Sequence, residues 1–201
     1  MDDLPRCRAT TWGEIDGWAD RLSDGIRAAG LAPEALVALT RGGWVPARLL
    51  ADRLGVHRLL PLRVRHWGVT ATMSGRAELT DDFPGSVAGE RILIVDDICD
   101  TGESLELARA HVAARGPAQL ETATFLHIAD SKLQPTHFAE EIARDAWVWV
   151  VFPWNYWEDL RALAGRVAGA KPASVRRTLA ERCGWTVPLA HVEKVLAAPP
   201  A

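Results

Sequence analysis

The sequence predicts an α/β protein with a mostly parallel, twisted sheet flanked by helices and a small helical appendage at its C-terminal end. Short, nearly all-apolar runs such as 35–40 and 92–95 alternate with segments of helical periodicity, and parallel strands buried on both faces have such runs. Glycine and proline residues separate the two kinds of segment. With 48% apolar and 24% charged residues among 201, the chain can bury one sizeable core.

The first third of the chain contains two predicted helices and two predicted strands. A helix over 11–29 has apolar residues at helical spacing, and Thr11 and Glu14 match a capping box at its start. A strand at 35–40 is followed by a helix at 46–55, which begins with Pro46 and ends at Gly55. Residues 56–64 are the second strand candidate.

A long connection separates these elements from the rest. Residues 65–90 contain four glycines and no sustained period, and loops of this length are often functional or mobile. Strands are predicted at 91–97, 120–128 and 146–152, with a helix at 104–114. After Trp157 the pattern changes to three short helices, at 158–169, 174–184 and 188–197. We therefore predict a main domain over 1–157 and the appendage over 158–201.

Charge and cysteine content exclude several classes of function. The net charge of −3 gives no overall attraction to nucleic acid or membrane. Cys7, Cys99 and Cys183 are odd in number and far apart in sequence, which predicts reduced thiols rather than a disulfide framework or a zinc site. No secretory signal pattern is visible, and the apolar run 146–154 is far shorter than the ~20 residues that span a bilayer. We expect a cytoplasmic protein without membrane or nucleic-acid partners.

An acidic turn follows the strand at 91–97. Asp96 and Asp97 stand at the carboxyl end of that strand, where parallel α/β sheets bind ligands. The turn from Thr101 to Ser104 then leads into a helix, whose unpaired N–H groups can hold a phosphate. Ionised carboxylates only accept hydrogen bonds, so two of them beside a phosphate suit the hydroxyls of a sugar phosphate. The spacing differs from that of a nucleotide P-loop.

Residues 92–104, Ile-Leu-Ile-Val-Asp-Asp-Ile-Cys-Asp-Thr-Gly-Glu-Ser, resemble the phosphoribosyl-pyrophosphate signature of type I phosphoribosyltransferases. The resemblance implies that family's fold, phosphoribosyl pyrophosphate as a substrate and Mg²⁺ as a cofactor. It implies that Asp96 and Asp97 hold the 2′ and 3′ hydroxyls of the ribose and, through water, Mg²⁺. The residues implied to cradle the 5′-phosphate are Thr101, Gly102, Glu103 and Ser104.

A second loop supports the resemblance. Thr40, Arg41, Gly42 and Gly43 follow a predicted strand and resemble the pyrophosphate-binding loop of the family's 6-oxopurine branch. Glycines let backbone N–H groups approach an anion closely, and Arg41 adds a forked cation. The family often has a non-proline cis peptide in this loop. By the same resemblance, residues 65–79 would be a flexible hood that closes over the reaction and excludes water.

Other residues match the base site of the 6-oxopurine branch. The resemblance implies that Asp100 faces N7 of the base and acts in proton transfer, to which a positioned carboxylate contributes ~10²–10⁴ in rate. Lys132 matches the lysine that donates to O6 of the purine. Because an ammonium group only donates, it favours a 6-oxo group over the 6-amino group of adenine.

The aromatic segment 146–154 resembles the base-stacking element of bacterial xanthine-guanine and archaeal hypoxanthine phosphoribosyltransferases. Trp149 would stack on the purine, and backbone groups of Val150 would contact its 2-position edge. Trp147 lies two residues away on the same predicted strand face and is an alternative stacking residue. Asn155 stands where relatives often have an acid near magnesium, which leaves a second metal contact in doubt.

The resemblance thus implies a 6-oxopurine phosphoribosyltransferase of purine salvage, acting as a homodimer, with the choice among hypoxanthine, guanine and xanthine open. One alternative is a regulator of the same fold that binds nucleic acid and senses phosphoribosyl pyrophosphate or nucleotide. From Trp157 onward, seven Lys and Arg stand against four Asp and Glu, and short helices could form a helix-turn-helix. A further alternative is a transferase that acts on an unusual base.

Overall fold

The computed structural model describes residues 4–66, 77–167 and 171–198, which fall into two compact units. Among the described residues, 13–66 and 77–147 form the larger unit, and 4–12, 148–167 and 171–198 form the smaller unit. Most of the predicted hood at 65–79 lies outside the described residues. No helix in the described ranges is long and apolar enough to cross a membrane.

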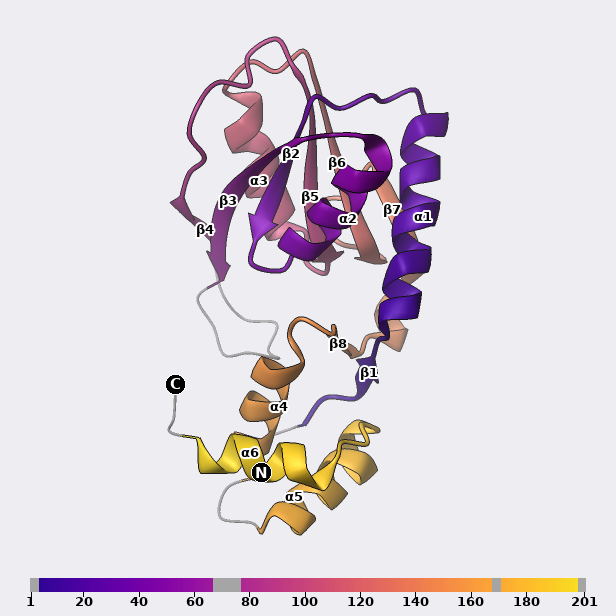
Figure 1. Cartoon of the computed structure of the whole chain (residues 1–201), viewed down its shortest axis with the longest axis vertical. Coiled ribbons are helices and arrows are strands. Elements are labelled where there is room, and N and C mark those ends of the chain that lie inside the picture. Colours follow the sequence, from indigo (N-terminus) through magenta and orange to yellow (C-terminus); the bar gives the residue numbers. More distant parts are fainter. Residues whose placement is uncertain (1–3, 67–76, 168–170, 199–201) are drawn as a thin grey trace. The chain divides into compact units, whose positions relative to one another are not determined.

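The larger unit is built on a six-stranded sheet with the strand order β4-β3-β2-β5-β6-β7 (Figure 1). Neighbouring strands are parallel except for the antiparallel pair β3 and β4, which confirms the predicted, mostly parallel sheet. The strands are β2 (Ala35–Thr40), β3 (Arg58–His66), β4 (Ala77–Asp81), β5 (Arg91–Cys99), β6 (Gln119–Ile128) and β7 (His137–Ile142).

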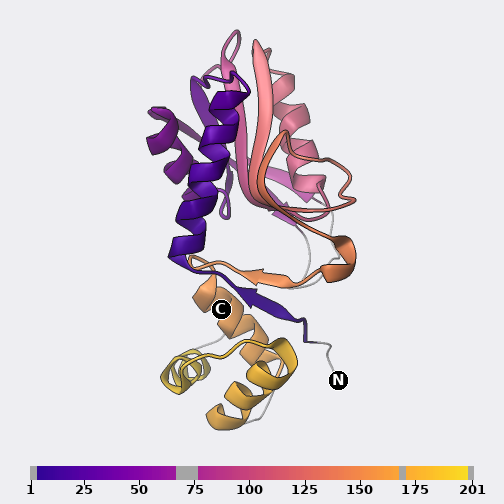
Figure 2. The ribbon, with the colours of Figure 1, turned by 90° about the vertical axis from the view of Figure 1, so that its right-hand side faces the viewer.

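Helices cover both faces of this sheet. Figure 2 shows α1 (Trp12–Ala28) and α2 (Trp44–Leu54) on one face and α3 (Glu103–Ala113) on the other. Leu105, Ala108 and Val112 of α3 are buried in one cluster with strand residues that include Val37 and Ile94. The predicted apolar stripe of the first helix is also confirmed, since its buried residues recur at helical spacing: Ile15, Trp18, Leu22 and Ile26.

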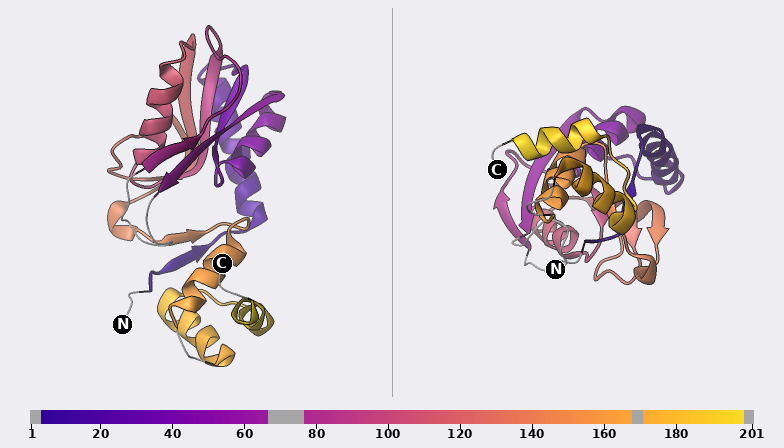
Figure 3. Two further views of the ribbon diagram at one scale, coloured as in Figure 1. Left: turned by 90° about the vertical axis from the view of Figure 1, so that its left-hand side faces the viewer. Right: turned by 90° about the horizontal axis from the view of Figure 1, so that it is seen from below.

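The smaller unit joins the N-terminal strand to the C-terminal helices. Its strands β1 (Cys7–Ala9) and β8 (Trp149–Val151) form a two-stranded parallel sheet, shown with the helices in Figures 1 and 3. Leu4 and Val151 share a buried core with Leu160, Val175 and Val192 of the helices. The helical elements are α4 (Tyr156–Gly165), α5 (Pro172–Thr178), the π-helical turn η2 (Leu179–Cys183) and α6 (Leu189–Ala197).

Two expectations about this region change. The strand predicted at 146–152 is not part of the large sheet: only Trp149–Val151 is extended, and it pairs with β1. The large sheet instead takes β7 as its edge strand. β7 was not predicted because its polar sequence His-Phe-Ala-Glu-Glu-Ile suits a half-covered edge. The boundary predicted after residue 157 stays a prediction, and contacts group 148–157 with the C-terminal helices.

Candidate functional site

The predicted donor-binding residues gather at one edge of the large sheet. β2, β5 and β6 are neighbouring parallel strands, so their carboxyl ends lie at the same edge. Thr40 is the last residue of β2, Asp96 and Asp97 lie near the end of β5, and Lys132 follows β6. The larger unit therefore brings together residues 40–43, 96–104 and the loop that carries Lys132.

The predicted pyrophosphate loop packs directly against the acidic end of β5 through its glycines. A methyl group built on Gly42 would lie 2.4 Å from Oδ2 of Asp97, and one built on Gly43 would lie 2.4 Å from the carbonyl oxygen of Val95. Real Cβ atoms do not approach so closely, so only glycine lets the residue 40–43 loop pack against the acidic end of β5. This contact places the loop beside the carboxylate pair.

The backbone of the first loop has the form that the resemblance implies. The peptide bond between Thr40 and Arg41 is cis. Gly43 then caps the start of α2, and its N–H donates to the carbonyl of Leu39 at 2.8 Å. The side chain of Arg41 is exposed at this edge.

Asp96 and Asp97 form a crowded acidic pair. Asp97 is only 7% exposed. Oδ1 of Asp97 accepts the N–H of Ile98 at 2.9 Å, and Oδ1 of Asp96 accepts the N–H of Asp97 at 3.0 Å. Burial, and then the negative charge of Asp97, raise the pKa of Asp96 well above its usual value. The pair therefore favours a ligand that brings hydrogen-bond donors or positive charge.

A tight turn connects the acidic pair to α3. Gly102 caps this helix with φ of 85°, and a methyl group built on it would lie 2.7 Å from the backbone nitrogen of Leu133. Positive φ and close packing both require glycine here. The N–H of Glu103 is 3.4 Å from Oγ1 of Thr101. The first N–H groups of α3, an eleven-residue helix, thus begin directly after the acidic pair, in an arrangement that suits a phosphate.

Asp100 has partners for both carboxylate oxygens. Arg144 donates from Nη1 to Oδ1 at 2.7 Å and from Nη2 to the backbone carbonyl of Asp100 at 2.8 Å. The indole Nε1–H of Trp147 donates to Oδ2 at 3.1 Å. Sequence reasoning did not identify Arg144, because nothing in the pattern around it distinguishes it from a surface arginine.

Lys132 lies on a loop that packs against the acidic turn. Its backbone N–H donates to the carbonyl of Thr101 at 2.9 Å, and its Nζ donates to Oε1 of Glu103 at 2.6 Å. The hydrogen bond to Glu103 raises the pKa of Lys132. The hydroxyl of Ser131 donates to the carbonyl of Leu133 at 2.9 Å and also contacts the ring of His127. The ammonium group is thus held by an acid of the phosphate turn.

Trp149 and Val150 belong to the smaller unit. Both lie on β8, where Trp149 is the register partner of Cys7 and Val150 that of Arg8. The Trp149 ring packs against the core of the smaller unit, and its buried Nε1 has no hydrogen-bond partner among the described residues. Trp147 follows a short 3₁₀ turn, η1 (Arg144–Ala146), rather than lying in a strand, so the two tryptophans do not share a strand face. Their roles toward a base stay predictions.

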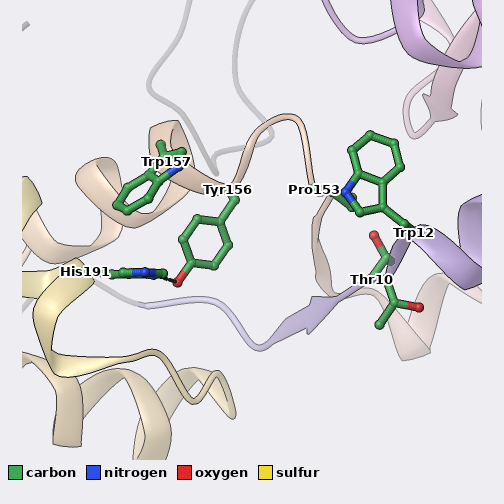
Figure 4. A pocket seen from close by; sticks show the side chains of 7 residues that line it. Thr10, Trp12, Pro153, Tyr156, Trp157 and His191 are labelled. Atoms are coloured by element: carbon green, nitrogen blue, oxygen red, sulfur yellow. Dashed lines mark hydrogen bonds between the residues drawn. The ribbon is translucent and has the colours of Figure 1, made fainter.

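The smaller unit also contains an aromatic cavity of about 430 Å³. In Figure 4, Tyr156, Trp157 and His191 lie on one side of it, and Trp12 and Thr10 lie on the other. The Tyr156 hydroxyl is hydrogen-bonded to Nδ1 of His191 at 2.8 Å. None of the predicted site residues lines this cavity. Its lining residues are Thr10, Thr11, Trp12, Pro153, Tyr156, Trp157 and His191.

Known proteins resemble most of the chain. The model of the phosphoribosyl transferase domain matches residues 12–160. Xanthine-guanine phosphoribosyltransferase of Ruegeria sp. (strain TM1040) is 30% identical over 149 residues, which covers 64% of this chain and 75% of that protein. The enzyme of the same name from Desulfotalea psychrophila is 28% identical over 122 residues, which covers 61% of this chain and 70% of that protein.

Solved structures agree with this similarity. The purine phosphoribosyltransferase of Pyrococcus horikoshii is 25% identical, with a TM-score of 0.64, and the match covers 74% of this chain and 93% of that one. The xanthine-guanine-hypoxanthine phosphoribosyltransferase of Helicobacter pylori is 21% identical, with a TM-score of 0.62 and coverage of 80% and 99%. At that identity the second match supports the fold alone.

Proposed function

The chain belongs to the phosphoribosyl transferase domain family, and we propose that it transfers the 5-phosphoribosyl group of phosphoribosyl pyrophosphate to N9 of a 6-oxopurine base. The products are a nucleoside monophosphate and pyrophosphate, as purine salvage requires. The observation that carries the proposal is the close approach of Gly42 to Asp97, because it brings the loop predicted to bind pyrophosphate beside the acids predicted to bind the ribose.

The donor would be held by groups of the larger unit. The carboxylates of Asp96 and Asp97 accept hydrogen bonds from the ribose 2′ and 3′ hydroxyls. The N–H groups and hydroxyls of residues 101–104 hold the 5′-phosphate at the start of α3. The backbone of residues 40–43 and the guanidinium of Arg41 hold the pyrophosphate that leaves. Holding both ends of the donor orients C1′ toward the base and lowers the entropic cost of reaction.

The base would be bound by Lys132 and deprotonated with the help of Asp100. Asp100 takes part in proton transfer at N7 as N9 attacks C1′, and Arg144 orients its carboxylate. Lys132 leaves Glu103 and donates a hydrogen bond to O6 of the base. The 6-amino group of adenine would instead face another hydrogen-bond donor, so adenine is disfavoured. Trp149 and Val150 lie in the smaller unit, and the resemblance implies that Trp149 stacks on the ring and that backbone groups of Val150 contact its 2-position edge. Removal of a proton by a positioned carboxylate accounts for ~10²–10⁴ of the rate.

The residues present fit Mg²⁺, the cofactor that the family implies. Carboxylate oxygens are the ligands Mg²⁺ prefers, and a cation would offset the burial and the charge of Asp97 that raise the pKa of Asp96. The described part of the chain has no group of three or more His, Cys, Asp and Glu that could hold a metal. As the resemblance implies, Asp96 and Asp97 would hold the ion through water. When bound, Mg²⁺ neutralises negative charge on the leaving pyrophosphate.

The two alternatives have no comparable support. The regulator that binds nucleic acid is favoured by no observation on the described residues. A transferase for an unusual base would have the same fold, and no observation on the described residues favours it. A homodimer and a cytoplasmic location are retained as predictions.

The test is product identification with a panel of bases. Purified protein, phosphoribosyl pyrophosphate and Mg²⁺ are incubated with hypoxanthine, guanine, xanthine or adenine, and nucleotide and pyrophosphate are quantified. We expect equimolar products from at least one 6-oxopurine and discrimination against adenine by as much as ~10⁴–10⁵. Excess chelator should stop turnover and added Mg²⁺ should restore it. Equal turnover of adenine, or no product from any 6-oxopurine, would contradict the proposal.

A further inference from the structure

A row of three polar side chains crosses the large sheet near the carboxyl ends of its strands. Cys99 of β5 is the register partner of His127 of β6, and His127 is the register partner of Glu141 of β7. His127 is only 3% exposed. Its Nδ1 is hydrogen-bonded to Oε2 of Glu141 at 3.1 Å, and its Nε2 is hydrogen-bonded to Oγ of Ser131 at 2.9 Å. Partners at both nitrogens fix the direction of the ring.

The row holds the loop of residues 129–133 against the sheet. The Ser131 hydroxyl donates to the carbonyl of Leu133 at 2.9 Å, and the Cys99 thiol donates to the same carbonyl at 3.2 Å. Burial raises the pKa of Cys99 to about 11, so the thiol remains a donor at neutral pH. A hydroxyl donates one hydrogen bond and accepts others, so Ser131 can contact His127 and Leu133 together.

This loop has an unusual backbone conformation. Asp130 has φ of 64°, and in the part of the chain that the structure describes no other residue except glycine has positive φ. Residues with a side chain seldom adopt this conformation, which persists where surrounding contacts determine it. The N–H of Ala129 donates to the carbonyl of Ile142 at 2.8 Å, and that of Lys132 donates to the carbonyl of Thr101 at 2.9 Å. The backbone bonds hold both ends of the loop, and the side-chain row holds its middle.

The position of the loop decides where the ammonium group of Lys132 can reach. The Lys132 side chain is 63% exposed, so packing does little to direct it. Its ion pair with Glu103 is of the exposed kind, which contributes little. The loop backbone must therefore place the lysine for the hydrogen bond to O6 that the proposed function requires.

We propose that His127 is a positioning residue, which acts through Ser131 to fix the loop that carries Lys132 and so sets the preference for a 6-oxopurine base. The effect on the base rests on the proposed function. The effect on the loop follows from the hydrogen bonds of His127 and Ser131 alone. The two effects are therefore measured separately.

Hydrogen exchange followed by mass spectrometry tests the effect on the loop without any substrate. His127→Leu removes both ring hydrogen bonds and keeps an apolar group at a buried position. We expect faster exchange in peptides that contain residues 129–133 and unchanged exchange in α1. His127→Gln, whose amide can still reach Ser131, should restore part of the protection. Unchanged exchange of residues 129–133 in His127→Leu would overturn the proposal.

The same two strands offer a matched control. Nε2 of His137, the first residue of β7, is hydrogen-bonded to Oε2 of Glu121 on β6 at 2.6 Å. This second pair of histidine and glutamate lies near the amino ends of the strands, away from residues 129–133. His137→Gln should therefore leave the exchange of that loop and the kinetics of the base unchanged.

Steady-state kinetics tests the effect on the base. His127→Leu should raise the KM for the 6-oxopurine roughly 2–10-fold, the fold-change of one lost hydrogen bond, and leave the KM for phosphoribosyl pyrophosphate unchanged. The ratio of kcat/KM between the 6-oxopurine and adenine should fall by the same factor, and His127→Gln should recover part of both. A purely structural role would reduce the amount of folded enzyme and leave both KM values unchanged, and that result would also overturn the proposal.

A second pair of variants covers the case in which His127→Leu does not fold. Ser131→Ala removes the hydroxyl link and should give the same two results, whereas Ser131→Thr keeps a hydroxyl and should restore the values of the natural chain. If the natural chain turns over no 6-oxopurine, the proposed function fails, and the exchange measurement alone then decides whether His127 holds the loop.

Discussion

Replacing Arg144 tests whether the orientation of Asp100 controls catalysis. Arg144→Gln removes the two hydrogen bonds from the guanidinium to Asp100 and a third, at 3.2 Å, to the carbonyl of Ala129. The bond from Trp147 to the other carboxylate oxygen remains. The carboxylate should therefore stay near the site but lose its fixed direction, so the variant should lower kcat and leave the KM for phosphoribosyl pyrophosphate unchanged.

The size of the effect follows from the exposure of the pair. The side chains of Arg144 and Asp100 are 31% and 29% exposed, so we take the lower part of the ~1.5–3 kcal/mol range for hydrogen bonds to charged groups. A loss of ~1.5–2 kcal/mol in the transition state lowers kcat by roughly 10–30-fold. Arg144→Lys should fall between the variant and the natural chain, because an ammonium keeps the charge but not the fork.

The assay is steady-state kinetics with a double-mutant cycle. Asp100→Asn alone should lower kcat by roughly 10²–10⁴. If Arg144 acts through Asp100, adding Arg144→Gln to Asp100→Asn should cost little more. Arg58→Gln is a matched control, since Arg58 pairs with Glu90 near the amino ends of the strands, and it should change stability but not kcat. A kcat of Arg144→Gln within twofold of the natural chain, or fully multiplicative losses in the double variant, would refute the reasoning.

Four further predictions concern other site residues, the C-terminal helices and nucleic acid. The pKa of Asp96 is raised in the folded protein. Asp96 therefore stabilises the fold fully below the unfolded pKa of about 3.9, and this stabilisation is lost as the pH rises through the folded pKa. Asp96→Asn should therefore stabilise the ligand-free protein at neutral pH while impairing donor binding; a difference in melting temperature that does not grow with pH would contradict this. Glu103→Gln removes the ion pair with Lys132 and should lower the KM for the base. The effect should be a few-fold at most, because exposed ion pairs are weak. A raised KM with unchanged kcat would contradict this and show that Glu103 helps to place the lysine. Truncation after Asp159 removes buried residues such as Leu160 and Val192, each worth ~1.5–3 kcal/mol, and should destabilise the protein or change its oligomeric state. The full-length protein should show no salt-sensitive nucleic-acid binding at micromolar concentration, and a gel shift at two salt concentrations checks this.

Strand and loop positions in the larger unit could be predicted because local signals agree there. Burial on both faces of the sheet is the physical interpretation of the apolar runs of β2 and β5. Close approach of the backbone to its neighbours is that of the glycines at 42, 43 and 102. The structure places these residues at the same sheet edge. The cis peptide after Thr40 agrees with the resemblance, although no residue pattern alone indicates it.

Contacts between distant segments could not be predicted. The partners of Asp100 and Lys132, namely Arg144 and Glu103, follow from side-chain directions that periodicity does not contain. β1 has only three residues and no pattern of its own, so its pairing with β8 was missed. The packing of Cys7 against the core that contains Cys183 was missed for the same reason, because the two residues are far apart in sequence.

We propose that one sheet edge of this protein binds a purine nucleotide through the residues named above. A crystal structure of the protein with guanosine 5′-monophosphate and Mg²⁺ tests it most directly. We expect the 5′-phosphate at residues 101–104, the ribose hydroxyls at Asp96 and Asp97, and Lys132 turned from Glu103 to O6. A nucleotide bound elsewhere, for example in the cavity lined by Trp12 and Trp157, with this edge empty and Lys132 still on Glu103, would contradict it.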